Sequence, residues 1–196
     1  MTKKSEPQKR MSKTERRTQL LDVALTIARA EGTDALTLGH VAERAGVSKP
    51  VAYEHFGTRA GLLVALCERI DERQLAVLHE ALDRAPRKLA DIAKAASAQY
   101  MHCYVTVGPE WHALLGALQG DEAMNAYQRT IVARYVEVFR KALAPYSKLG
   151  AAELRRRCVG IVGAAEAISR DMLAGQISEA AASQTLAAIL SASVSS

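Results

Sequence analysis

The feature that most constrains this chain is a tight turn over residues 45–48, set between two short stretches of helical periodicity. Thr37 can cap the first stretch, and Gly46 can end it in a left-handed conformation that glycine adopts without strain. Ser48 can cap the second stretch, where Pro50 is tolerated because first-turn amides have no intrahelical partner. Two short helices joined by a glycine turn are typical of a helix-turn-helix, whose second helix enters a DNA major groove.

The rest of the chain predicts helices and no sheet. Hydrophobic residues make up 49% of the 196 residues and aromatic residues only 5%, and abundant Ala and Leu favour helices over strands. We therefore expect an all-α fold of about nine helices. Their predicted ranges are 14 to about 32, 38–45, 49–56, 59–84, 87–106, 110–119, 121–144, 151–174 and 178–193.

The net charge is concentrated at the N-terminus. The first 17 residues hold two acids and seven bases, so the whole formal net charge of +5 lies there. A basic arm of this kind can be a solubilising tail, but beside a helix-turn-helix we expect it to follow DNA phosphates. The bases are Lys3, Lys4, Lys9, Arg10, Lys13, Arg16 and Arg17.

Other function classes find little support. Cys67, Cys103 and Cys158 are too widely spaced for zinc or a redox pair, and we expect reduced thiols packed as small hydrophobic residues. No paired carboxylates, nucleophile elbow or Gly-rich phosphate loop appears, so we expect no catalytic residues, no metal and no cofactor. Without a long apolar run or a secretory signal, a cytoplasmic location is expected.

A helical wheel divides the second helix of the motif into faces. Ala52 and Phe56 point inward, Pro50, Val51 and Glu54 point outward, and Tyr53 and His55 flank the outward face. Central positions approach base edges, whereas the flanks meet the sugar-phosphate walls. Val51 can contact a thymine methyl group and Glu54 can accept from a cytosine amino group. The DNA-binding candidates are Thr37, Ser48, Lys49, Pro50, Val51, Tyr53, Glu54, His55, Thr58 and Arg59.

Simpler interpretations stay open for three of these candidates. Thr37 and Ser48 can be only helix caps, and Glu54 can be only a solvated residue beside Lys49 or Arg44. Glu54 also repels phosphates, so any reading of a base carries an electrostatic cost.

Residues 15–63 resemble the DNA-binding domain of the TetR family of bacterial transcriptional regulators. The resemblance implies a phosphate contact for Tyr53 and for Arg59, where the family usually has Lys. Two departures are Ala52, smaller than the usual residue, and Glu54, where larger polar or basic residues are common. The matching features are Leu21, Ala24, Ala28, Gly32, Thr37-Leu38, Val41-Ala42, Ala45-Gly46-Val47-Ser48, Lys49-Pro50, Tyr53, His55-Phe56, Arg59 and Leu62-Leu63.

A heptad pattern marks the helix predicted at 151–174. The pattern alone fits a central core helix or one half of an intermolecular four-helix bundle. Gly160, Gly163 and Ala167 on the same helix would allow close helix approach. The resemblance favours a homodimer, because the family dimerises through its last two long helices. The predicted dimer residues are Leu154, Cys158, Ile161, Ala165, Ile168, Met172, Leu186 and Leu190.

Aromatic and soft residues gather between positions 100 and 139. Such residues suit either a core or a small-molecule pocket, and the resemblance favours a pocket for an effector of unknown identity. The predicted ligand-binding residues are Tyr100, Cys103, Tyr104, Trp111, Leu115, Met124 and Tyr127.

The domain organisation follows from these assignments. We expect a disordered basic arm over 1–13, a helix-turn-helix domain over 14–58, and a helical ligand-binding and dimerisation domain over 59–196. The expected function is that of a homodimeric regulator, a repressor that a small molecule releases from a palindromic operator in double-stranded DNA. The alternative is a helical DNA-binding or architectural protein without an effector.

Overall fold

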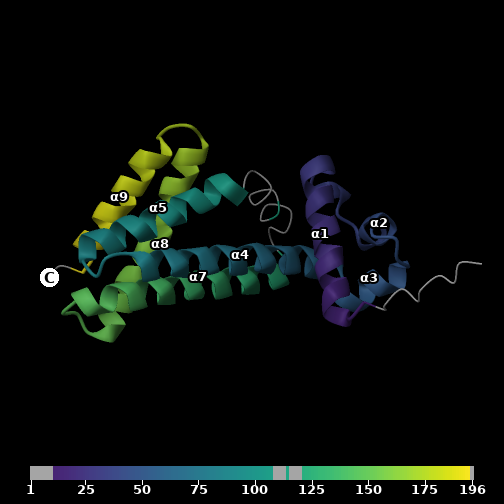
Figure 1. The fold of residues 1–196 in the computed structure, drawn as a ribbon, viewed down its shortest axis with the longest axis horizontal. Coiled ribbons are helices and arrows are strands. Elements are labelled where there is room, and N and C mark those ends of the chain that lie inside the picture. Colours follow the sequence, from purple (N-terminus) through teal and green to yellow (C-terminus); the bar gives the residue numbers. More distant parts are fainter. Residues whose placement is uncertain (1–10, 108–113, 115–120, 195–196) are drawn as a thin grey trace, which may run out of the picture. The chain divides into compact units, whose positions relative to one another are not determined.

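The computed structural model describes residues 11–107, 114 and 121–194, and no strand occurs in these ranges (Figure 1). The all-α prediction is confirmed. The helix predicted at 110–119 lies outside the described residues apart from Leu114. The eight α-helices of the described ranges are α1 (Lys13–Glu31), α2 (Leu38–Arg44), α3 (Lys49–Phe56), α4 (Arg59–Arg84), α5 (Leu89–Val107), α7 (Glu122–Leu143), α8 (Ala151–Leu173) and α9 (Glu179–Ala192). Two short 3-10 turns, Thr33–Ala35 and Ala144–Tyr146, were not expected.

The chain divides into two compact units, Met1–Leu66 and Cys67–Ser196. The boundary lies inside α4, whereas the sequence suggests a division between residues 58 and 59. Among the described helices, none is long and apolar enough to span a membrane.

Local capping sets the helix ends of the first unit. Ser12 and Glu15 form a reciprocal capping box, so α1 begins at Lys13 and the predicted arm ends one residue earlier than expected. The Thr37 hydroxyl accepts from the His40 amide at 3.1 Å, as a cap should. The Ser48 side chain makes no capping hydrogen bond. Gly46 has φ +68°, which confirms the predicted left-handed turn.

The first unit is built on apolar side chains from α1 to α4. Leu20, Ala24 and Ile27 of α1 are fully buried, as are Val41 of α2 and Leu62 of α4. Burial of this kind gains about 1.5–3 kcal/mol for each large side chain. The small core therefore fixes α2 and α3 against α1.

The start of α4 passes unusually close to the end of α3. A Cβ atom placed on Gly61 would lie 2.2 Å from the carbonyl oxygen of Phe56, a distance that real Cβ atoms do not reach. The Thr58 hydroxyl accepts from the Gly61 amide at 3.0 Å and caps α4, as predicted. Position 61 is therefore limited to glycine by the approach of the backbone of α3.

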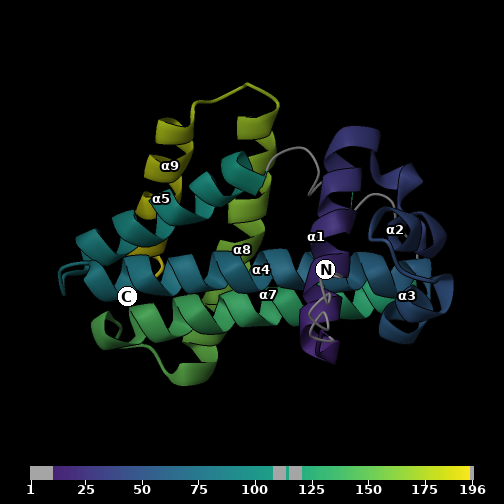
Figure 2. The same cartoon turned by 45° about the vertical axis from the view of Figure 1, so that its right-hand side comes forward.

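The second unit is a helical bundle in which α5 runs beside α9 and α7 beside α8 (Figures 1 and 2). Its core includes fully buried Met101, Phe139 and Leu186. Cys67 and Cys158 are buried free thiols, as expected, and Cys103 is half-buried.

The predicted dimer residues of α8 and α9 face the core of this unit. They pack within their own chain, and their role in a dimer interface stays a prediction. The heptad pattern indicates that α8 is buried on more than one side, and the helices α5, α7 and α9 cover those sides. The buried members are Leu154, Cys158, Ile161, Ala165, Met172, Leu186 and Leu190, with Ile168 partly buried against the same core.

Replacing Gly61 by Ala should destabilise the first unit by about 2 kcal/mol or more, because the new methyl group must displace the Phe56 carbonyl or shift α4. Urea unfolding followed by circular dichroism measures the change. Gly39→Ala on α2 is the matched control, since its Cβ would meet only the flexible Lys49 side chain at 3.5 Å. Equal stability of Gly61→Ala and Gly39→Ala would contradict the close approach.

Candidate nucleic-acid interface and effector cavity

The helix α3 presents the faces that the wheel predicts. Ala52 and Phe56 are buried, whereas Pro50 and Glu54 are exposed and Tyr53 is 54% exposed. Val51 is half-buried, so only part of its side chain can reach a base edge. An exposed aromatic ring beside exposed polar residues is unusual on a protein surface and suits a contact with a partner.

Arg17 of α1 anchors the C-terminal end of α3, a role that the sequence analysis missed. Its guanidinium donates to the carbonyl of His55 at 2.9 Å and lies over the Phe56 ring, 4.9 Å from the ring centroid. A cation over an aromatic face gains about 0.5–2 kcal/mol. Arg17 lies one helical turn before Leu20 and Leu21, next to the apolar face of α1. That position in the sequence could have indicated that Arg17 packs against another helix.

Arg59, a predicted phosphate contact, is engaged by backbone carbonyls of its own unit. Its Nε donates to the carbonyl of Leu36 at 2.9 Å and its Nη2 to the carbonyl of Thr33 at 2.8 Å. The guanidinium is half-buried and clamps the 3-10 turn before α2 onto the start of α4. With two donors already engaged by backbone, Arg59 acts first as a structural residue.

Glu54 is paired with a base from another helix. Its Oε1 lies 3.2 Å from Nζ of Lys13, and both side chains are largely exposed. Neither Lys49 nor Arg44, the partners considered from sequence, forms this ion pair. An exposed pair of this kind is worth little in stability, and it offsets the repulsion between Glu54 and nearby phosphates.

His55 is half-buried on the flank of α3. Burial lowers its pKa, Glu54 raises it, and Lys13, Arg17 and Arg16 lower it further. The imidazole is therefore neutral at pH 7, where it can donate one hydrogen bond but adds no positive charge.

The remaining candidates lie exposed around α3. The hydroxyls of Thr37 and Thr58 accept capping hydrogen bonds, and each keeps its own hydrogen to donate. The arm over 1–10 lies outside the described residues. The exposed candidates are Thr37, Ser48, Lys49, Pro50, Tyr53, Glu54 and Thr58.

A cavity of about 410 Å³ lies within the second unit, among α4, α5, α7 and α8. Tyr100, Cys103 and Tyr104, three of the predicted ligand-binding residues, line it. Met124 and Tyr127 of α7 are buried and are not among its lining residues. Trp111 and Leu115 lie outside the described residues.

Two acids in the cavity wall were missed as ligand-site residues. Asp71 is only 4% exposed, and its Oδ2 has no hydrogen-bond partner among the described residues. Glu166 of α8 also lines the cavity, and the charge of Arg170 lowers its pKa while burial raises it. The signal for Asp71 was its position in the stripe Leu63, Cys67, Asp71, Leu75, Leu78 and Leu82, where it is the one acid on an apolar face.

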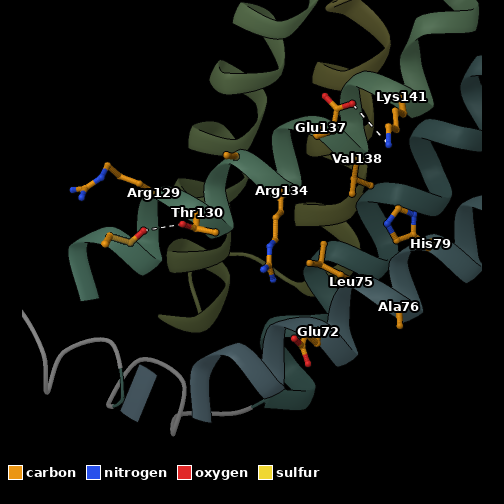
Figure 3. Close-up of a pocket in the computed structure, with 12 residues that line it drawn as sticks. Glu72, Leu75, Ala76, His79, Arg129, Thr130, Arg134, Glu137, Val138 and Lys141 are labelled. Atoms are coloured by element: carbon orange, nitrogen blue, oxygen red, sulfur yellow. Dashed lines mark hydrogen bonds and ion pairs between the residues drawn. The ribbon is translucent and has the colours of Figure 1, made fainter. Parts of the chain in front are cut away.

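A second hollow, a groove of about 1070 Å³, runs between α4 and α7 (Figure 3). Leu75 and Val138 form part of its floor, and Arg134 extends into it from α7. It is wider than the cavity but lies open on the surface, so a small ligand there would keep most of its contact with water. The enclosed cavity is the better candidate for a ligand.

Comparison with known proteins identifies the first unit. Residues 20–66 match the family described as bacterial regulatory proteins, tetR family. This segment is therefore similar to the DNA-binding region of TetR-family regulators. The matched segment includes α2, α3 and the start of α4, and therefore the residues that present the exposed face of α3.

Individual relatives extend this family assignment. The activator FasR of Mycolicibacterium smegmatis is 37% identical over 73 residues, 37% of this chain and 33% of FasR. The regulator BetI of Rhizobium meliloti is 42% identical over 50 residues, 26% of this chain and 25% of BetI. The matched segments thus span about a third and a quarter of these two relatives. FasR and BetI are both named as transcriptional regulators, which is the class of protein that the sequence predicts.

Similarity to solved structures extends over the second unit. The multidrug binding protein EbrR, solved in complex with imidazole, has 22% identity and a TM-score of 0.65. The match covers 89% of this chain and 94% of that chain. At this identity the similarity establishes the fold alone, which the two proteins share over most of their length.

Replacing Arg59 by Ala should lower the free energy of unfolding by about 2 kcal/mol, because two half-buried backbone carbonyls lose charged donors. Thermal and urea unfolding in the absence of DNA measure the loss. Arg73→Ala, an exposed residue further along α4, is the matched control and should change little. Unchanged stability of Arg59→Ala would show that the clamp is not formed and would return Arg59 to phosphate binding.

Proposed function

We propose that this protein is a homodimeric transcriptional regulator that binds a palindromic operator through α3 and responds to a small molecule bound in the second unit. The observation that supports it most directly is α3 itself. Its inward residues Ala52 and Phe56 are buried, and its outward residues Pro50, Tyr53 and Glu54 are free to meet a partner. This arrangement occurs within the segment that matches the TetR family.

Affinity for DNA would come from the residues around α3. Lys49 supplies a positive charge, and Ser48, Tyr53 and Thr58 supply hydroxyl donors for phosphate oxygens. The basic residues of the arm at 1–10 add electrostatic attraction that depends on salt. Sequence preference would rest on Val51 and Glu54, the two side chains with groups that can distinguish base edges.

The helix α4 supports a link between ligand and DNA. Its residues Leu62 and Leu63 are fully buried in the first unit, and its residues Ile70 and Asp71 line the cavity of the second. A ligand that prefers one position of this helix shifts the population of the DNA-binding state. EbrR, which has the same fold, is described as a multidrug binding protein, and this supports a small-molecule effector here.

The direction of regulation depends on where the operator lies relative to the promoter. An operator that overlaps the promoter gives the repression expected from sequence. The relative FasR is named as an activator, which supports activation as the alternative direction.

The homodimer would form through a face of α8 other than the buried heptad residues. Val159 is 45% exposed and Leu173 42% exposed. Gly160, Gly163 and Ala167 are exposed beside them, and a Cβ at either glycine would meet nothing within 4 Å. These side chains are small or apolar, so an identical helix related by two-fold symmetry could approach them closely.

Replacing Gly163 by Arg should convert the dimer to a monomer, because a long charged side chain would enter the centre of this face. The single chain should tolerate it, since the position is exposed and Arg favours a helix more than Gly does. Sedimentation equilibrium measures the change. Ala98→Arg on the exposed side of α5 is the matched control. A dimer that persists in Gly163→Arg would rule out this face.

The proposal is tested by selecting random DNA duplexes with the purified full-length protein. We expect a motif with two-fold symmetry, whose affinity falls steeply with salt. Gel-shift titration of the selected duplex against a scrambled one measures the preference. Recovery of no motif, or equal affinity for both duplexes at every salt concentration, would refute sequence-specific regulation.

Two substitutions on α3 separate phosphate contacts from base contacts. Tyr53→Phe should weaken binding by a similar factor on all duplexes, since it removes one phosphate donor. Glu54→Ala should instead change the preference at one base pair per half-site, by about 1–3 kcal/mol. Affinities on single-base variants of the selected motif measure both. A uniform effect of Glu54→Ala would assign Glu54 to its ion pair with Lys13 alone.

A further inference from the structure

The cavity of the second unit is chemically unusual for its size. A volume of about 410 Å³ suits a small organic molecule, yet two of its lining residues are acids. Asp71 enters from α4 and Glu166 from α8. Most of the remaining surface is apolar or aromatic, so these two carboxyl groups are the features that can decide which ligand is chosen.

Asp71 is the stronger of the two observations. Its side chain is more than nine-tenths buried, and its Oδ2 has no hydrogen-bond partner among the described residues. Burial raises its pKa to about 8, Arg134 lowers it and Glu68 raises it. A buried polar atom without a partner is expensive to keep. A group that binds in the cavity and pairs with Oδ2 would remove that cost.

Glu166 adds negative character on the opposite helix. It is half-buried, and burial raises its pKa while the charge of Arg170 lowers it. Arg170 also lines the cavity but is itself exposed. Among the described lining residues, the cavity thus carries two carboxyl groups that are buried or half-buried, whereas its base, Arg170, is exposed.

Three tyrosines complete the wall. The ring of Tyr100 lies 5.6 Å from that of Tyr104 and 5.3 Å from that of Tyr135 between centroids. Burial raises the pKa of each phenol, so the rings stay neutral and present electron-rich faces. Such faces attract a cation, and the attraction is greater where water is excluded.

We propose that this cavity binds an organic cation, an amine or quaternary ammonium group on an apolar body, with its charge placed against Asp71. This rests on the proposed function in which the cavity is the effector site. An anion would meet two carboxyl groups, and among the described lining residues Arg170 is the one base that could offset them. A neutral ligand could at most donate a hydrogen bond to Oδ2 of Asp71, without the added attraction of a charge.

Binding of the cation competes with a proton at Asp71. A cation favours the ionised carboxylate, so its affinity rises with pH as the free carboxyl group ionises. With a pKa of about 8, the ionised fraction grows about tenfold between pH 7 and pH 9. Cys103 and Tyr135 face the same group but keep their protons, because burial raises the pKa of Cys103 to about 12 and that of Tyr135 further above its usual value.

The first test is calorimetric titration of the full chain with three probes of one shape. Benzyltrimethylammonium carries a charge that does not titrate, neopentylbenzene is its neutral isostere, and phenylacetate is an anion. We expect the cation to bind at least about tenfold more tightly than the other two. Its affinity should rise about tenfold from pH 7 to pH 9. Equal affinity for the neutral probe, tighter binding of the anion, or no binding of the cation would overturn the proposal.

The second test uses variants that change one charge each. Asp71→Asn should lower the affinity for the cation about tenfold or more and abolish its rise with pH. Asp83→Asn is the matched control, an exposed acid on the same helix that makes the same change in net charge. Glu166→Gln, at a half-buried position, should lower the affinity by a smaller factor and keep the rise with pH, and it provides a readout if Asp71→Asn does not fold. Unchanged affinity in both cavity variants would overturn the proposal.

The same probes separate this inference from the proposed function. Binding of the cation without any effect on the affinity for the selected duplex would leave the ligand class standing and refute the effector role. If the protein binds its operator but prefers the neutral or the anionic probe, the proposed function stands and the inference about the ligand class is refuted. The two failures are therefore distinguishable with one preparation.

Discussion

The close passage of α4 across the end of α3 is the constraint on which the first unit depends. Gly61 gives the Phe56 carbonyl room that a side chain would fill, and this proximity fixes where α3 ends. A helix of eight residues is marginal by itself in water. Its direction is instead imposed from outside, by Arg17 on the His55 carbonyl and by the burial of Ala52 and Phe56. The small Ala52 fits this picture, because a tightly approached helix has little room beneath it.

Charged residues have opposite environments in the two units. In the first, Arg17 and Arg59 have their guanidinium groups engaged by backbone carbonyls, and the charge contributes to a rigid scaffold. In the second, Asp71 is buried and its Oδ2 has no hydrogen-bond partner among the described residues, so ionisation of this carboxyl group opposes folding. Local rules of stability are most often broken where a protein needs a group for another purpose. That contrast is the physical reason for regarding the cavity, and not the open groove, as the place for a ligand.

Sequence predicted best what depends on local chemistry. The bounds of α3 and α4, the positive φ of Gly46 and the capping role of Thr37 follow from residues within one or two turns. The heptad of α8 shows the limit, because periodicity reports that Leu154 and Ile161 are buried but not by what. The clamp of Arg59 and the burial of Asp71 depend on segments far apart in sequence. No pattern within a single helix could have supplied them.

Proposed control of DNA binding by the cavity has a definite energetic requirement. A ligand changes the population of two states only by the difference between its affinities for them, and a shift from 1:99 to 99:1 needs about 5.5 kcal/mol. The energy of apolar contacts changes gradually as helices slide past one another. A ligand in a flexible apolar cavity can therefore bind both states with nearly equal affinity. A buried carboxyl group changes more sharply, because its interaction with a cation depends strongly on distance and on the exclusion of water. Asp71 on α4, the helix that also packs in the first unit through Leu62 and Leu63, is therefore the group best suited to make the two states unequal.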